Sequence, residues 1–190
     1  LKRELLTKKS HDIFKNVQAL FDLAYATNDM DLNYKVRSIC AEKSQKFKKD
    51  RPEHAEKYRQ LYKNTLLFAA PVDFDSFCRY IEWNREPSKR FYLPRRKQLK
   101  VVADALQDLA DDKLDLLAIS MPPGVGKTTI AIFYLAWMGG RVPNSPMLGG
   151  SHSNSFLRGV YDEILRVVDK DGEYLWHDVF PNIAISNTNA

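Results

Sequence analysis

The sequence has few cysteines, and their spacing argues against a metal or disulfide scaffold. Only two occur among its 190 residues, Cys40 and Cys78. Neither has a CxxC partner or a nearby cluster of histidines, so neither a zinc site nor a disulfide framework is indicated. We expect two reduced thiols that lie in the core or are half buried, which is consistent with the cytosol.

Long apolar runs are also absent. The longest uncharged apolar stretches, such as residues 130–140, are well short of the roughly 20 residues that a membrane-spanning helix needs. We therefore expect a soluble chain with no membrane partner. No secretory or transit signal opens the sequence, and it begins with Leu1 rather than Met, so we expect a fragment of a longer protein.

The sequence does contain enough apolar side chains for a packed core. Apolar residues make up 44% of the chain and aromatic residues 12%, which at this length favours one core and at most a small extra module. Charge is uneven, because residues 1–66 hold 15 Lys and Arg against 9 Asp and Glu, whereas residues 67–190 hold 14 against 15. The N-terminal surplus fits a surface that meets nucleic acid or another acidic partner, or a solvated helix face.

Helical spacing dominates the first 70 residues. Apolar side chains recur at the intervals of a helix face, at Ile13, Val17, Leu20, Phe21 and Ala24 and again at Tyr34, Val36, Ile39 and Cys40. A third helical segment spans about residues 53–67, directly after Pro52. The pattern predicts an N-terminal α-helical region over residues 1–70, with three helices in an antiparallel bundle.

The remaining region, residues 71–190, is predicted to combine helices with strands. Five segments follow one another after a first helix at about residues 73–83: a helix at 96–108, a buried strand at 114–120, a helix at 128–138, a strand at 147–150 and a helix at 153–168. The order strand, helix, strand, helix implies a parallel sheet with right-handed crossovers. The predicted fold class is therefore α/β, with the partial parallel sheet of a P-loop NTPase core flanked by helices.

A glycine-containing segment between the first predicted strand and its helix predicts a phosphate-binding loop. Residues 121–129 read MPPGVGKTT. Glycines allow a loop to turn its backbone N–H groups towards phosphate, and Lys127 would reach the β and γ phosphates as the catalytic residue, while the Thr128 hydroxyl would coordinate magnesium. The predicted loop contacts to the nucleotide are Pro123, Gly124, Val125, Gly126, Lys127, Thr128 and Thr129. Met121 replaces the first glycine of the usual G-x-x-x-x-G-K-[ST] pattern, and an ordinary glycine turn capped by Thr128 is the alternative.

A second segment upstream combines aromatic, cationic and amide side chains just before a predicted helix. Residues 91–98 read FYLPRRKQ. Gln98 carries a donor and an acceptor that match the edge of adenine, and the Tyr92 ring or the Arg95 guanidinium could stack on the base. The segment predicts an adenine clamp, although a glutamine at this position is equally compatible with an ordinary surface residue.

Taken in order, these segments resemble the large terminase subunit of tailed bacteriophages, the ATPase that drives DNA into the procapsid. The resemblance covers residues 73–190 and rests on five segments: DFDSFCRYIEW, FYLPRRKQL, AISMPPGVGKTT, SHSNSFLRGVYDEILRVV and YLWHDVFPNIAIS. The second resembles an adenine-reading Q motif, and the third resembles the Pro-Pro form of the Walker A loop. In that form a methionine, here Met121, often replaces glycine.

The resemblance implies an ATPase that uses ATP and Mg²⁺ and acts on double-stranded DNA. The partners that it implies are the portal protein, the small terminase subunit and further copies of the chain in a ring, in the cytoplasm of a bacterial host. By position, Gln98 would read adenine, residues 124–129 would hold phosphates and magnesium, and residues 151–153 would match the motif that couples to DNA. Many terminases also have an arginine inside the Walker A loop; Pro123 and Gly124 occupy those places here, and Arg158 is a candidate substitute.

Two parts that the resemblance implies have no counterpart in this sequence. No apolar strand ending in Asp-Glu follows residue 150, so the Walker B carboxylate and the glutamate that activates water are missing. The two-metal nuclease of the family would lie beyond Ala190. We therefore expect this fragment to bind nucleotide but to hydrolyse it poorly or not at all.

Two other functions fit parts of the sequence. The first is a P-loop kinase or small-molecule phosphotransferase, against which the FYLPRRKQL segment argues, because such an enzyme needs a substrate lid and no upstream Q motif. The second is a non-catalytic interaction module, in which the basic N-terminal helices dock onto a partner and the loop binds nucleotide for assembly. Nucleotide-dependent oligomerisation without turnover would favour the second.

Overall fold

The chain divides into two compact units, with the boundary between Ala69 and Ala70. The computed structural model describes residues 10–184, and all regular secondary structure in that range is helical.

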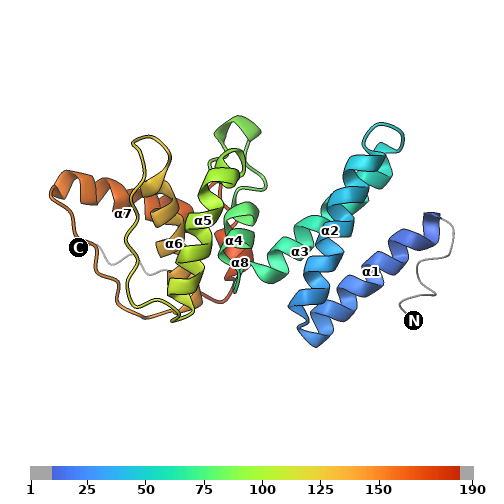
Figure 1. The fold of residues 1–190 in the computed structure, drawn as a ribbon, viewed down its shortest axis with the longest axis horizontal. Coiled ribbons are helices and arrows are strands. Elements are labelled where there is room, and N and C mark those ends of the chain that lie inside the picture. Colours follow the sequence, from blue (N-terminus) through green and yellow to red (C-terminus); the bar gives the residue numbers. More distant parts are fainter. Residues whose placement is uncertain (1–9, 185–190) are drawn as a thin grey trace. The chain divides into compact units, whose positions relative to one another are not determined.

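The first unit consists of the three helices that its apolar spacing predicts. These are α1 (Ser10–Thr27), α2 (Met30–Phe47) and α3 (Pro52–Ala69), and Figure 1 shows α2 running antiparallel to α3. Asp29 caps α2 by accepting a hydrogen bond from the Leu32 N–H at 2.8 Å, and Pro52 occupies the first position of α3, where no N–H is needed. The three helices enclose a core of Val17, Phe21, Val36, Cys40, Tyr58 and Leu61.

A buried polar contact joins α2 to the end of α3. Arg37 is 8% exposed and donates through Nη2 to the Thr65 carbonyl at 2.7 Å, and the Asn33 amide donates to the same carbonyl at 3.0 Å. The C-terminal end of a helix carries partial negative charge. The arginine therefore lies where the C-terminal end of α3 stabilises its charge.

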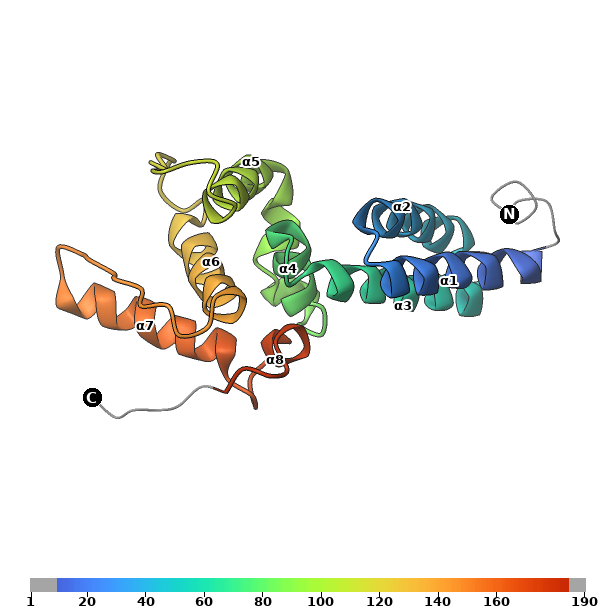
Figure 2. The same cartoon turned by 90° about the horizontal axis from the view of Figure 1, so that it is seen from below.

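The second unit is built around α6. Its elements are α4 (Phe74–Ile81), the short 3-10 helix η2 (Pro87–Lys89), α5 (Tyr92–Ala110), α6 (Lys127–Arg141), α7 (Asn154–Val168) and α8 (Trp176–Val179). Helix α6 packs against α4 and α5 on one side and against α7 on the other, and α8 lies against α4 and α7 (Figures 1 and 2).

Aromatic side chains fill the space between these helices. The Trp137 ring of α6 is fully buried beside Phe74 of α4, with ring centroids 5.2 Å apart, and its Nε1 donates to the Ala70 carbonyl at 2.9 Å. Trp176 of α8 is buried in the same way and donates to the Ala136 carbonyl at 2.8 Å. Each tryptophan thus combines a large apolar contact with a satisfied polar atom.

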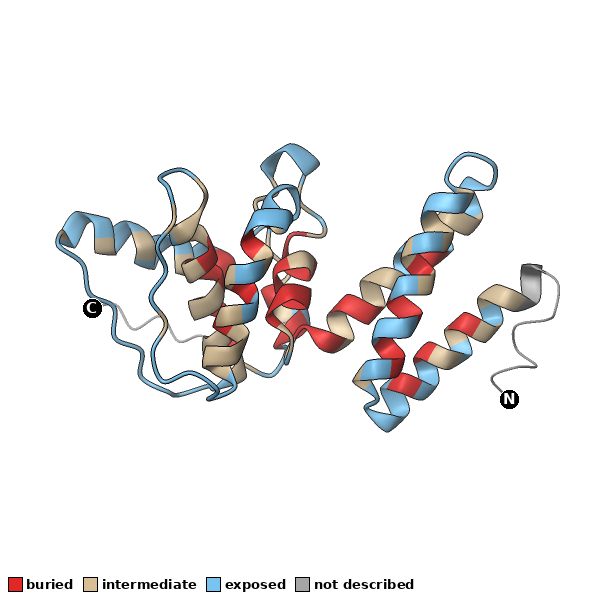
Figure 3. Ribbon diagram, viewed as in Figure 1, coloured by how far each residue is buried: buried red, intermediate tan, exposed pale blue. Residues whose placement is uncertain are grey.

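The predicted α/β fold class is wrong for the described residues, which contain no strand and no sheet. Residues 114–120 and 147–150 were expected to be strands of a parallel sheet, but within the described residues neither segment pairs with the other or with a third. Their apolar side chains face solvent, with Leu116 84% exposed and Leu148 fully exposed, and Figure 3 draws both segments as largely exposed. An extended segment without a partner cannot satisfy its backbone groups in a sheet, so water takes that place.

No helix among residues 10–184 is long and apolar enough to cross a membrane.

Candidate functional site

The glycine segment forms a tight turn that leads directly into α6. Gly124 has φ of +80° and Gly126 has φ of +102°, a region that side chains of L-residues rarely enter. Gly126 is the residue before the helix, and no side chain caps the first turn. The two glycines therefore let the chain enter α6 with the beginning of the helix uncovered.

This turn leaves a row of backbone donors available. Within the described residues, no hydrogen bond uses the N–H groups of residues 124–129; the first N–H in use is that of Ile130, which donates to the Gly126 carbonyl at 3.0 Å. Free N–H groups at a helix beginning, together with the helix dipole, attract anions. The loop thus offers the donor set that phosphate oxygens require.

Two side chains of the first turn of α6 supplement these donors. The Lys127 ammonium folds back and donates to the Met121 carbonyl, across the mouth of the turn. Thr128 is exposed, and its hydroxyl makes no hydrogen bond within the described residues. Lys127 therefore holds the turn closed in this structure, and the exposed Thr128 hydroxyl is accessible to a ligand.

Phe91 lies directly against the glycine turn. A Cβ atom on Gly126 would stand 2.6 Å from Cζ of Phe91 and closer still to Cε2. The same ring contacts Phe133 of α6 edge to face, with centroids 5.6 Å apart. Residue 126 must therefore be glycine for two reasons, its backbone conformation and the space that the ring occupies.

The two glycines give a matched pair of predictions. Gly126→Ala should lower the free energy of unfolding of the second unit by about 2 kcal/mol, since positive φ and steric overlap act together. Gly124→Ala should cost only about 1 kcal/mol, because no atom lies within 4 Å of its Cβ position. Urea denaturation followed by circular dichroism measures both. Equal losses for the two variants would contradict the contact between Gly126 and Phe91.

The predicted adenine clamp is not assembled as one surface. Tyr92 is fully buried, and its hydroxyl donates to Asp75 at 2.7 Å. Arg95 is exposed, with its guanidinium 5.4 Å from the centre of the Phe91 ring. Gln98 is exposed and has no hydrogen-bond partner among the described residues. Arg95 and Gln98 thus remain accessible on α5, whereas Tyr92 supports the helix from inside.

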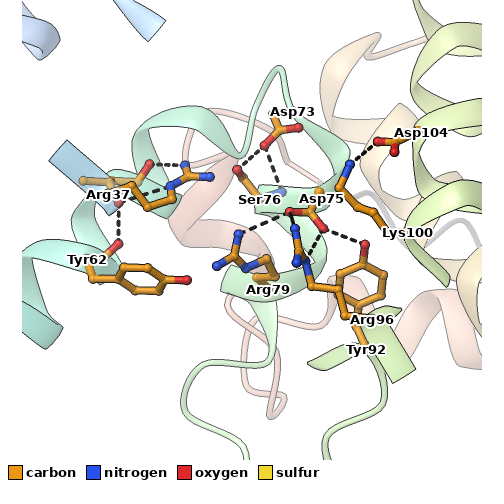
Figure 4. Close-up of polar contacts among 11 residues, drawn as sticks. Arg37, Tyr62, Asp73, Asp75, Ser76, Arg79, Tyr92, Arg96, Lys100 and Asp104 are labelled. Carbon is orange, nitrogen blue, oxygen red and sulfur yellow. Dashed lines mark hydrogen bonds and ion pairs between the residues drawn. The ribbon is translucent and has the colours of Figure 1, made fainter. Parts of the chain in front are cut away.

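Burial keeps the Tyr92 hydroxyl protonated. Desolvation, and after it the nearby Cys78 and Asp75, raise the pKa of Tyr92 far above its ordinary value, while Arg96 acts in the opposite direction. A protonated hydroxyl can donate to the Asp75 carboxylate, which also accepts from Arg96 Nε at 2.7 Å. Figure 4 shows these groups converging on Asp75. The cluster fixes the beginning of α5 against α4.

Glu82, which the sequence analysis did not single out, contributes to the setting of the loop. Its side chain is fully buried and accepts from the Phe91 N–H at 2.7 Å and from the Tyr92 N–H at 2.8 Å. Its negative charge is paired with Arg85, whose Nη1 lies 3.1 Å from Oε1. No local pattern marks a glutamate as the cap of a helix that begins ten residues later.

The segment at residues 151–153 has a local role in α7. Ser153 precedes that helix and accepts a hydrogen bond from the Phe156 N–H at 3.4 Å, as a capping residue does. Arg158 lies exposed on α7 without a partner among the described residues. Within residues 10–184, neither the segment 151–153 nor Arg158 makes a hydrogen bond or an ion pair with the glycine loop.

Two hollows of the described surface lie elsewhere. One of 880 Å³ is lined by the end of α7, His177 and residues 181–184, and one of 560 Å³ lies between α6, α7 and the same residues. Neither includes a residue of the loop. The donors of the loop, and not the size of a hollow, match a phosphate ligand.

Metal binding by protein groups alone has no support in the described residues, where no three His, Cys, Asp or Glu side chains are grouped to hold an ion. Magnesium that arrives with a triphosphate needs few protein ligands, since phosphate oxygens and water fill most positions. The Thr128 hydroxyl fits that requirement. No family model matches the chain, and comparisons with curated proteins and with solved structures likewise find no match.

Proposed function

We propose that residues 121–129 bind the triphosphate of a nucleotide, with ATP and Mg²⁺ as the ligand. The observation that carries the proposal is the row of N–H groups at residues 124–129, which donate to nothing in the described chain. They surround a turn with two positive-φ glycines at the beginning of α6. Every helix leaves the N–H groups of its first turn without a partner, here those of residues 126–129, and the turn adds the N–H groups of Gly124 and Val125 at the positive end of the helix dipole.

Each group at the loop would then have a definite part. The Lys127 ammonium exchanges the Met121 carbonyl for phosphate oxygens, where it acts as a point charge. The backbone N–H groups of residues 124–129 hold the phosphate chain, and the Thr128 hydroxyl holds magnesium. The ion, when bound, neutralises phosphate charge. Arg95 and Gln98 are the accessible groups of α5 for the base.

The wider role that we propose is that of the ATP-binding fragment of a viral DNA-packaging motor, in which the full-length protein hydrolyses ATP. It rests on the order and spacing of the sequence segments that resemble the large terminase subunit. In that role, ATP hydrolysis is coupled to movement of double-stranded DNA, with portal protein and small terminase subunit as partners. The basic surplus of residues 1–66 is compatible with an acidic partner such as DNA.

A lysine substitution tests nucleotide binding. Lys127→Ala should weaken MgATP binding by about 30-fold, because a charge-assisted contact contributes about 2 kcal/mol. Isothermal titration calorimetry measures this. The matched control is Lys113→Ala, which removes an exposed lysine of the same unit that pairs with Asp108 at 2.9 Å, and which should bind MgATP as the unchanged protein does.

The outcomes separate the two levels of the proposal. Equal affinity of the Lys127→Ala and Lys113→Ala variants would remove the loop as the binding site. The DNA part is tested with the same proteins by fluorescence anisotropy of a labelled duplex. Duplex binding that is the same with and without MgATP would count against the motor, while leaving nucleotide binding in place.

A further inference from the structure

We propose that Phe91 is a positioning residue of the phosphate loop, and that buried Glu82 holds it in place. The ring would keep the loop turned for binding without itself contacting phosphate. This inference rests on the proposed function of residues 121–129, and it adds the source of the loop's conformation, which lies outside the loop.

The Phe91 ring fills the space that the glycine turn would need in order to unwind. Its Cε2–Cζ edge lies where a side chain of residue 126 would stand, at the residue with φ of +102° that directs the chain into α6. Glycine has many alternative conformations, so an isolated turn of this kind would sample several. A ring packed against the Gly126 backbone restricts the residue to the conformation that leaves the N–H groups of residues 124–129 uncovered.

The backbone of Phe91 is held by the two oxygens of one carboxylate. Glu82 is fully buried, with Oε1 2.7 Å from the Phe91 nitrogen and Oε2 2.8 Å from the Tyr92 nitrogen. A buried carboxylate is costly unless its oxygens are hydrogen-bonded and its charge is paired. Arg85 supplies that pairing at 3.1 Å, so the arrangement is satisfied as a whole and has few alternatives.

The ring is supported from behind as well. Arg85 Nη1 donates to the Tyr174 hydroxyl at 2.7 Å. Tyr174 contacts Phe133 edge to face at 5.7 Å, and Phe133 contacts Phe91 at 5.6 Å. Groups from the end of α4, from α6 and from the segment before α8 therefore locate the ring. Its position is determined by the fold of the second unit and not by the loop itself.

The contacts favour positioning over stacking on a base. The Arg95 guanidinium lies 5.4 Å from the ring centre and its Nη1 donates to the Phe91 carbonyl at 3.3 Å. One face of the ring is thus covered by the cation, and one edge meets Gly126. A base would have to displace Arg95 to reach that face.

The test compares two ligands that share the phosphate chain. MgATP and inorganic tripolyphosphate with Mg²⁺ are titrated into the unchanged protein and into Phe91→Leu. Loss of the ring should weaken both ligands by the same factor, about tenfold, which is usual when support behind a binding group is removed. The control is Leu93→Ala, an apolar change two residues from Phe91. The Leu93 side chain is 36% exposed, so this variant should leave both affinities unchanged.

A readout without ligand distinguishes positioning from general stability. The amide resonances of Gly124 and Gly126 in the nucleotide-free protein should shift in Phe91→Leu and not in Leu93→Ala. Should Phe91→Leu fail to fold, as judged by circular dichroism, Phe91→Met carries the same test, because its flexible, unbranched side chain fills an irregular space without a ring.

The outcomes are distinct. Weakening of MgATP alone would make Phe91 a base contact and overturn the inference, as would unchanged affinity for both ligands. If the unchanged protein bound neither ligand, the proposed function would fall and the inference with it. Equal weakening with shifted glycine resonances supports the positioning role.

Discussion

Replacing Trp137 with alanine is expected to lower the free energy of unfolding of the second unit by about 3 to 5 kcal/mol, the range for large aromatic side chains deleted from a core. The ring is fully buried beside Phe74 and Tyr134. Its loss also leaves the Ala70 carbonyl, an acceptor at 2.9 Å, without its donor, and takes away the ring over which the Arg141 guanidinium lies at 4.9 Å.

The two cysteines make this prediction measurable for each unit separately. Burial raises the pKa of the Cys40 thiol to about 12 and raises the pKa of Cys78 well above its ordinary value. Since the thiolate is the reactive form, both should react with a disulfide reagent only when their unit opens. Trp137→Ala should speed labelling of Cys78, with Cys40 as the reference in the other unit.

A surface substitution provides the comparison for Trp137. Val101 is 75% exposed on α5, so Val101→Ala should change the free energy of unfolding by less than about 0.5 kcal/mol. Urea denaturation gives the free energy of unfolding. Labelling at several concentrations of the thiol reagent gives the rate of reaction at Cys78. If Trp137→Ala labelled at Cys78 no faster than Val101→Ala does, the tryptophan would not be part of the core that closes the second unit.

The helices were predictable because their signal is local. Apolar residues of α1 such as Val17, Phe21 and Ala24 recur at helical spacing, and all three are buried in the structure. Helix beginnings were less predictable. Helix α5 begins at Tyr92 and not near residue 96, because Glu82 accepts the Phe91 and Tyr92 N–H groups and because Pro94 is tolerated in a first turn. That cap comes from another helix, and no local pattern contains it.

The prediction of two strands was wrong for a related reason. A short apolar run such as residues 114–120 is compatible with a buried strand, but a strand exists only where a neighbour supplies hydrogen bonds. Sequence spacing cannot show whether that neighbour is present. In the structure it is not present among residues 10–184, and Leu116 faces solvent.

The sequence motif located the glycine loop but did not indicate which residues support it. The two glycines and Lys127 predict a turn before a helix, and both glycines have positive φ in the structure. Of the two aromatic residues upstream, the sequence analysis chose Tyr92, yet Phe91 is the one against Gly126. Neighbouring residues at a helix beginning point in directions about 100° apart, so one position decides which ring meets the loop.

Removing the Asp75 carboxylate is expected to cost nearly as much stability as removing Trp137. Asp75 accepts from the Tyr92 hydroxyl at 2.7 Å, from Arg96 at 2.7 and 2.9 Å and from Arg79 at 3.2 Å. Asp75→Ala removes the acceptor that these donors share, and breaking a buried ion pair from one side costs about 3 to 5 kcal/mol. We expect about 3 kcal/mol, because the Arg96 side chain is 37% exposed and water can partly replace the carboxylate.

An exposed ion pair within α5 provides the control for Asp75. Lys100 pairs with Asp104 one turn along α5, as Figure 4 shows, but Asp104 is 57% exposed. Asp104→Ala should therefore cost less than about 1 kcal/mol in the same urea titration. Because Asp75 fixes the beginning of α5, where Phe91 meets the loop, its loss should also broaden the amide resonance of Gly126, which Asp104→Ala should not do. Similar losses of stability for the two variants would mean that burial does not distinguish the pairs, and that the cluster at Asp75 does not hold α5 against α4.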